Sequence, residues 1–358
     1  CKSFINKILN MQITFIENSI DFTSSSLNYK AIDANKKNLI NFAEELAKNG
    51  HSITIYNNTN EVKKENGVLW ICLDSIKREY IEADVLIVCD DIELINNNVN
   101  SKIKFFWLSY FLEEADQKKA LVNLIKNKYI ILYNSISLIK NLKVNFNYVP
   151  KLHLDRGVNE SFFNIKKSNL SKCCALITSH PLRGLDWMLN VWKNVIALKV
   201  PWAELHIFSQ TLSTKNFSKN VKINNLKLKL YEYKNEGIFI KKPLIESEFI
   251  NNLNNYRVHL NPAINSDFFS SSILESQAAG IPVVSRINAN IHESIYNNET
   301  GYITNDINQF ATKTINLLND NVLFSRISNN AKLNNRIKKW KDIVGNFERA
   351  INENIIYR

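Results

Sequence analysis

The sequence predicts an α/β protein with two domains, each built on a parallel sheet that helices cover. Its length of 358 residues suits two domains of ordinary size. Short apolar runs alternate with polar or helical segments along the chain, which is the alternation that covered parallel sheets produce. The hydrophobic fraction of 45% and the charged fraction of 22% are typical of globular proteins. Neither a disordered nor a fibrous chain is expected.

The first half carries the strand and helix signals of one such domain. The apolar run at 11–16 predicts a first strand, and a polar loop with serines at 24–26 follows it. Apolar residues at helical spacing predict a helix over 33–48, ended by the Asn-Gly pair at 49–50. Further strands are predicted at 51–56, 68–71, 85–88, 103–108 and 129–133.

The second half repeats the pattern after Pro150. Strands are predicted at 175–178 and 203–208, the latter with His206 on its solvent-facing side. A helix at 246–253, strands at 256–260, 281–284 and 301–304, and a helix from about 307 follow. A basic helix with an apolar stripe ends the chain; its expected role is core packing, and attachment to a membrane surface is the alternative.

Several function classes are disfavoured by what the sequence lacks. No window approaches the roughly eighteen uninterrupted apolar residues of a spanning helix, so a soluble protein is expected. The cysteine usage indicates a reducing compartment, so a cytoplasmic location is expected. Neither a Gly-x-Gly-x-x-Gly nor a Walker-type loop occurs, which disfavours nicotinamide and ATP as ligands. The five cysteines show no metal-ligand spacing and are interpreted as reduced, buried thiols.

The charge of the chain favours anionic partners. The formal net charge is +11 and the pI is about 9.2. Zinc-finger spacing, an aromatic RNA-binding signature and dense Lys/Arg runs are all missing, which disfavours nucleic acid. Membrane surfaces and phosphate-bearing substrates remain as candidate partners.

The stretch 261–285 carries the most specific pattern. An apolar run ends in a loop, three serines follow, and a helical run at 273–279 closes at Gly280 before a short buried strand. Ser is a favoured N-cap, so the helix should begin at these serines. A helix N-terminus with free N–H groups suits a phosphate.

Two acids in this stretch carry a resemblance to a known family. Asp267 and Glu275 enclose seven residues, and Glu275 opens the run Glu-Ser-Gln-Ala-Ala-Gly-Ile-Pro-Val-Val. This pattern resembles the acid-x7-Glu signature of the GT-B glycosyltransferases in the large retaining family 4. The resemblance implies that Glu275 bonds the ribose of a nucleotide-sugar donor and that Asp267 is a catalytic residue facing the donor sugar. It makes donor-binding residues of Ser270, Ser271, Ser272 and Ile273.

A second motif follows the strand predicted at 175–178. The run Ser-His-Pro-Leu-Arg-Gly-Leu-Asp at 179–186 resembles the family's Gly-Arg…Lys-Gly turn, whose two cations neutralise the donor diphosphate. Arg183 stands at the Lys position, where the resemblance makes it a catalytic residue that can grip phosphate oxygens bidentately. The first cation is replaced by Thr178, although some family members carry a similar Ser-x-Pro-x-Arg-Gly-Leu. The donor contacts expected here are Thr178, Ser179 and His180, with a structural loop role as the alternative for His180.

The first domain should supply the acceptor side. Family members often carry a His after the strand that ends here at 107–108, and this chain has Ser109 and Tyr110 instead. Either the Ser109 hydroxyl substitutes for it, or the activity is weak or the acceptor unusual. Ser25, in the serine loop after the first strand, is the third acceptor-side candidate.

The resemblance implies a GT-B fold, with two Rossmann-like domains facing an interdomain cleft and a C-terminal helix crossing back to the first. We expect an acceptor-binding domain at 1–160, a nucleotide-sugar-binding domain at 161–335 and the returning helix at 336–358. The implied reaction is metal-independent, retaining transfer of a sugar from a nucleotide-sugar donor to a glycan, a lipid-linked acceptor or another hydroxyl, without a cofactor. The alternatives are a GT-B enzyme that epimerises a nucleotide sugar, and a catalytically silent module that binds sugar nucleotides or glycans.

Overall fold

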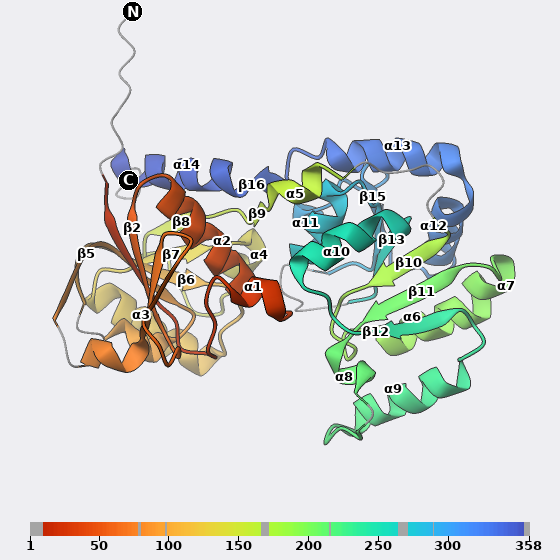
Figure 1. The fold of residues 1–358 in the computed structure, drawn as a ribbon, viewed down its shortest axis with the longest axis horizontal. Coiled ribbons are helices and arrows are strands. Elements are labelled where there is room, and N and C mark those ends of the chain that lie inside the picture. The colour runs from red at the N-terminus through yellow and green to blue at the C-terminus, as the bar shows by residue number, and fades with distance from the viewer. Residues whose placement is uncertain are drawn as a thin grey trace, which may run out of the picture. The chain divides into compact units, whose positions relative to one another are not determined.

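The computed structural model describes residues 10–77, 80–96, 99–165, 172–214, 216–263, 271–288 and 290–353. It divides into two compact units: unit 1 is Cys1–Gly157 with Lys338–Arg358, and unit 2 is Val158–Ile337. Each unit is built on its own sheet with helices packed against it (Figure 1). The predicted α/β architecture with two parallel sheets is confirmed.

Unit 1 contains an eight-stranded sheet in the order β3-β4-β2-β1-β5-β6-β7-β8. All neighbouring strands run parallel except the edge pair β3 and β4. The central strands are buried because their β-branched and aromatic side chains fill both faces. The strands are β1 Gln12–Ile16, β2 Ser52–Asn57, β3 Lys63–Glu65, β4 Val68–Cys72, β5 Ile81–Cys89, β6 Val99–Leu108, β7 Ile130–Tyr133 and β8 Lys151–His153.

Two helices from opposite ends of the chain pack together on this sheet. Helix α2 (Ala34–Lys48) begins where the Asp33 carboxylate accepts hydrogen bonds from the N–H groups of Asn35 and Lys36. Helix α14 (Trp340–Asn352) lies beside α2, with the ring of Phe347 5.1 Å from that of Phe42. The expected return of the C-terminal helix to the first domain is therefore confirmed. The other helices of unit 1 are α1 Ser26–Tyr29, η1 Leu73–Lys77, η2 Ile92–Ile95, α3 Glu114–Lys126 and α4 Ile136–Lys140.

Unit 2 contains a six-stranded sheet in the order β12-β11-β10-β13-β14-β15, and every pairing in it is parallel. Its strands are β10 Cys174–Ile177, β11 Glu204–Phe208, β12 Ile238–Lys241, β13 Val258–Asn261, β14 Val283–Ser285 and β15 Gly301–Ile303. The short strands β9 Gly157–Val158 and β16 Lys338–Lys339 form a separate pair.

Helices cover both faces of the second sheet. The larger ones are α6 Leu185–Val191, η3 Trp192–Ile196, α9 Val221–Glu232, α10 Glu246–Asn252, α11 Ser271–Ala278, α12 Ile307–Asn319 and α13 Asn321–Lys332. The shorter ones are α5 Glu160–Phe163, α7 Ala197–Lys199, α8 Gln210–Ser213, η4 Leu253–Asn255 and η5 Ile291–Glu293. None of the helices in the described part of the chain has the length and hydropathy needed to cross a bilayer.

Candidate donor and acceptor sites

The turn after β10 holds the predicted residues of the Ser-His-Pro-Leu-Arg-Gly-Leu motif. The Thr178 hydroxyl lies 2.7 Å from the Ser272 hydroxyl in the first turn of α11 and 3.2 Å from Nε2 of His259. His180 is exposed, and its Nδ1 accepts a hydrogen bond from the N–H of Leu182. The structure therefore brings Thr178 and Ser272, predicted from two separate motifs, into direct contact.

Gly184 determines the backbone path of this turn. Its φ is +88°, a left-handed conformation, and a Cβ on it would lie 2.2 Å from the carbonyl oxygen of Pro262. The turn that carries the partly buried Arg183 is thus packed against the chain leaving β13. Glycine is required because both the φ value and the close approach exclude a side chain.

Helix α11 buries almost all of its side chains. Glu275 is 6% exposed, and Ser271 and Ile273 are also buried. Burying a carboxylate is costly unless it is hydrogen-bonded or paired, so a buried Glu on a helix beside a polar turn points to a specific role. Asp267 and Ser270, predicted on the loop before α11, lie outside the described residues.

His259 anchors α11 to the sheet, a role that the sequence analysis missed. It lies on β13 between two partners, with Nδ1 2.9 Å from the Ser276 hydroxyl and Nε2 facing Thr178. Burial lowers the pKa of His259 to about 4, so the imidazole is neutral at physiological pH. A neutral ring can accept one hydrogen bond and donate another, which fixes Thr178 and Ser276 relative to each other.

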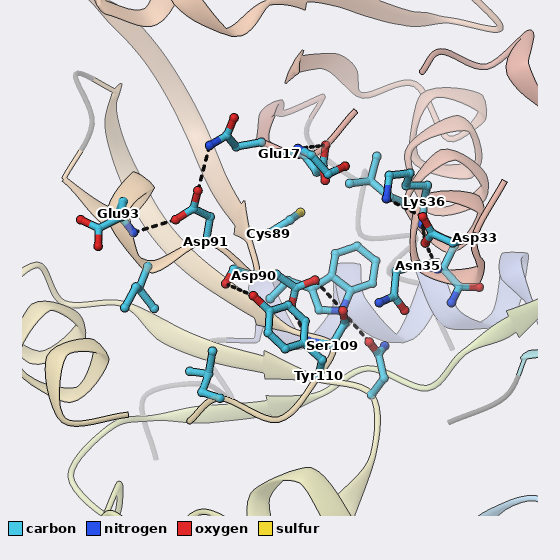
Figure 2. A pocket seen from close by; sticks show the side chains of 18 of the residues that line it. Glu17, Asp33, Asn35, Lys36, Cys89, Asp90, Asp91, Glu93, Ser109 and Tyr110 are labelled. Atoms are coloured by element: carbon cyan, nitrogen blue, oxygen red, sulfur yellow. Dashed lines mark hydrogen bonds and ion pairs between the residues drawn. The ribbon is translucent and has the colours of Figure 1, made fainter. Parts of the chain in front are cut away.

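A pocket of ≈ 410 Å³ lies within unit 1. Its centre is formed by residues that directly follow neighbouring parallel strands: Glu17 after β1, Asp90 after β5, Ser109 after β6 and Asn134 after β7. The carboxyl ends of parallel strands are where α/β proteins place ligands. Figure 2 shows Asp90, Ser109 and Tyr110 together, with Asp91 and Glu93 to one side and Asp33 and Lys36 to the other.

Asp90 is the polar centre of this pocket. It has a left-handed φ of +60°. Its carboxylate accepts hydrogen bonds from both the N–H, at 2.7 Å, and the hydroxyl of Ser109. Tyr110 donates its hydroxyl to the Asp90 carbonyl at 3.2 Å. The pKa of Asp90 is raised to about 6, mainly because the carboxylate is removed from solvent and to a smaller extent because of the nearby Glu17 carboxylate, while the Ser109 hydrogen bonds oppose the shift.

Other acids that line the pocket have structural partners. Asp33 caps α2 and pairs with Lys36, while Asp91 accepts the N–H of Glu93 at 2.9 Å and the side-chain amide of Asn18 at 3.0 Å. Burial raises the pKa of Glu17. Glu17 and Asp90 are thus two lining acids whose charged forms burial disfavours.

The acceptor-side predictions divide into two groups. Ser109 and Tyr110 line the pocket, whereas Ser25 does not. Ser25 donates its N–H at 2.8 Å and its hydroxyl at 3.1 Å to the Glu65 carboxylate, which ties the serine loop to β3. The sequence analysis missed Glu17, Asp90 and Asn134. Their common signal, a polar residue directly after a buried strand, could have found them.

The comparisons with known proteins agree with this architecture. Residues 173–320 match the family model described as Glycosyl transferases group 1. No curated protein matches the sequence.

Solved structures resemble the chain over nearly its whole length. Anabaena HepE, solved with UDP-glucose, has a TM-score of 0.74 at 10% identity, covering 96% of this chain and 100% of its own. Sucrose-phosphate synthase from Thermosynechococcus elongatus has a TM-score of 0.69 at 12% identity, covering 97% and 100%. A glycosyltransferase from Rickettsia africae has a TM-score of 0.68 at 16% identity, also covering 97% and 100%.

The match to the family model lies within unit 2, and the likeness to the solved structures extends over both units. Residues 173–320, within unit 2, thus match the glycosyl transferases group 1, and the chain as a whole has the two-domain GT-B fold of the solved structures.

Proposed function

We propose that the chain is a glycosyltransferase that holds a nucleoside-diphosphate sugar in unit 2 and transfers the sugar, with retention, to an uncharged hydroxyl acceptor bound in the unit 1 pocket. The observation that carries the donor assignment is the 2.7 Å contact between Thr178 and Ser272, which joins the two motifs expected to bind the donor. We assign the acceptance of the ribose hydroxyls to Glu275, which is buried and lies one helical turn after Ser271.

The groups around this contact suit the leaving diphosphate. As the bond from the sugar to phosphate breaks, negative charge grows on the diphosphate. Arg183 can bind its oxygens bidentately, and the N-terminal end of the α11 dipole adds positive partial charge. Because both interactions strengthen as the charge develops, they stabilise the transition state more than the bound donor. Thr178, in place of a first cation, leaves Arg183 as the charged residue that we assign to this task.

The acceptor assignment rests on the charge of the pocket. Among the described residues that line it, six are Asp or Glu and one is Lys, and that lysine is paired with Asp33. Like charges at close range are repelled, so a phosphorylated acceptor is disfavoured there. Carboxylates and amides accept hydrogen bonds from sugar hydroxyls, which favours a neutral sugar or glycan as the acceptor.

A screen of donors and acceptors tests the proposal. HepE was solved with UDP-glucose and with UDP, so UDP-glucose and UDP-N-acetylglucosamine are tried first, followed by GDP-, ADP- and TDP-sugars. Neutral sugars should accept a sugar from one of these donors, and their phosphorylated counterparts should react more slowly. Donor conversion to an epimer without acceptor would instead favour an epimerase. Tight donor binding with neither transfer nor hydrolysis would leave a binding module.

A further inference from the structure

A cysteine, a glutamate and a histidine converge in unit 2, away from the residues assigned to the donor. Parallel pairing sets Cys174 on β10 opposite Glu204 on β11, and His206 lies two residues along β11 on the same face. Cys174 Sγ is 3.6 Å from Glu204 Oε2, which is 2.8 Å from His206 Nε2. All three ligand atoms lie within 4.8 Å of one another.

The second nitrogen of His206 also has a partner. Its Nδ1 lies 2.9 Å from the Tyr256 hydroxyl. The rings of Tyr256 and Phe239 stand edge-on to the imidazole, with centroids 5.4 and 5.5 Å away. A metal-bound imidazole almost always donates its other N–H to an oxygen, which fixes the ring and its tautomer. The expectation that His206 faces solvent is therefore wrong, because packing and hydrogen bonds hold it on the covered face.

The location of the cluster separates it from the transfer reaction. Cys174 and Glu204 are the first residues of β10 and β11, at the amino end of the sheet. Thr178 follows the carboxyl end of β10, at the opposite end of the parallel strands. Cys174 is only 2% exposed, which disfavours a nucleophile or a redox thiol.

We propose that Cys174, Glu204 and His206 bind a transition-metal dication, with Zn²⁺ as the ion that this ligand set favours. Thiolate, imidazole and carboxylate oxygen are the ligands of zinc, at about 2.3, 2.0 and 2.0 Å. Tetrahedral coordination at those lengths sets sulfur about 3.5 Å from oxygen and nitrogen about 3.3 Å from oxygen. The observed sulfur–oxygen distance of 3.6 Å nearly matches. The observed nitrogen–oxygen distance of 2.8 Å requires the histidine and glutamate to separate by about half an ångström.

Metal binding exchanges hydrogen bonds for coordination. The Cys174 thiol proton leaves to solvent, because the thiolate is the ligand. His206 binds through Nε2 and carries its proton on Nδ1, which the Tyr256 oxygen accepts. Three protein ligands leave one position of a tetrahedral ion for water. The site would clamp β10 to β11 at the amino end of the sheet and take no part in sugar transfer.

Cobalt provides a direct test, since Co²⁺ replaces Zn²⁺ and reports on thiolate ligands through a near-ultraviolet charge-transfer band. The full chain, freed of metal with a chelator, should bind one Co²⁺ with such a band, and Zn²⁺ should displace it. Cys174→Ser should remove the band, and Tyr256→Phe should weaken binding about tenfold or more. Cys173→Ser is the matched control, because the Cys173 thiol donates to the Leu318 carbonyl at 3.4 Å and is outside the cluster.

Circular dichroism tests whether each variant folds. If Cys174→Ser does not fold, His206→Gln is the second variant that removes a metal ligand. His206→Gln should lower Co²⁺ affinity at least tenfold. No stoichiometric binding to the folded chain would overturn the proposal. So would a thiolate band that survives in Cys174→Ser or disappears in Cys173→Ser.

Discussion

At the residue scale, Asp90 gives the acceptor pocket a pH dependence. Its pKa of about 6 means that the carboxylate, which we expect to accept a hydrogen bond from the sugar hydroxyl, is protonated at lower pH. Below pH 6, kcat/KM should fall about tenfold per pH unit. The fall below pH 6 is the acidic limb of the pH profile. The Asp90→Asn variant should have a low kcat/KM that lacks this limb, as measured by initial rates from pH 4.5 to 8.

The neighbouring Glu17 provides a control with a defined sign. Its negative charge raises the pKa of Asp90, so Glu17→Gln should move the acidic limb to lower pH.

The raised pKa of Asp90 also affects the stability of the fold. Because the folded-state pKa exceeds the ordinary value of 3.8, Asp90 stabilises the fold below pH 3.8 and loses this contribution as the pH rises through about 6. An unchanged limb in Asp90→Asn would exclude Asp90 from the reaction.

Arg183 should matter through its fork of donors as well as its charge. Arg183→Ala should lower kcat about a hundredfold or more, while Arg183→Lys retains part of the rate because it keeps the charge without bidentate geometry. Lys199→Ala, an exposed cation at the end of α7, should leave the rate unchanged. Equal rates for the Ala and Lys variants would make Arg183 an ordinary surface residue.

At the element scale, helix α14 completes the core of unit 1. The buried Phe347 ring contacts Phe42 and Phe105, with centroids at 5.1 and 5.5 Å. Phe347→Ala should therefore lower the free energy of unfolding by about 3 to 5 kcal/mol. Asn346→Ala, one residue away and exposed, should change it little. Urea unfolding of the two variants measures the difference, and similar stabilities would mean that α14 does not hold unit 1 together.

Elements with a buried apolar run could be predicted from the sequence, and polar elements could not. The strands β1, β2, β7 and β11 were found within a residue or two because their side chains alternate or fill both faces. Strand β6 starts at Val99, earlier than predicted. The prediction missed its first half because Asn100, Ser101 and Lys102 are polar and give no strand signal. Strand β3, with the sequence Lys-Lys-Glu, was missed because it forms only by pairing with β4.

The sites show the same division. Local motifs predicted the residues after β10 and in α11, because a turn and a helix start lie within a few positions of each other. The acidic pocket and the Cys174, Glu204 and His206 cluster depend on strands that are neighbours in the sheet and distant in sequence. A polar residue directly after each buried strand is a sequence signal for the pocket, but only the strand order shows which of these residues lie close together, and the same holds for the cluster.

At the scale of the whole molecule, charge is distributed unevenly. The chain carries a formal net charge of +11, yet acids outnumber lysines six to one among the described residues that line the pocket in unit 1. A basic surface attracts anionic nucleotide sugars, while the acidic pocket disfavours anionic acceptors. The charge of the pocket would thus favour a neutral acceptor over an anionic one.

The most direct test of the account is a calorimetric titration of the full chain with the nucleoside diphosphate that the donor screen selects. If buried Glu275 accepts the ribose hydroxyls, Glu275→Gln should weaken binding by about 1.5 to 3 kcal/mol, since hydrogen bonds to a charged group are lost. Glu299→Gln, an exposed acid in the same unit, should bind like the original chain. Unchanged affinity in a folded Glu275→Gln variant would contradict the placement of the donor on α11.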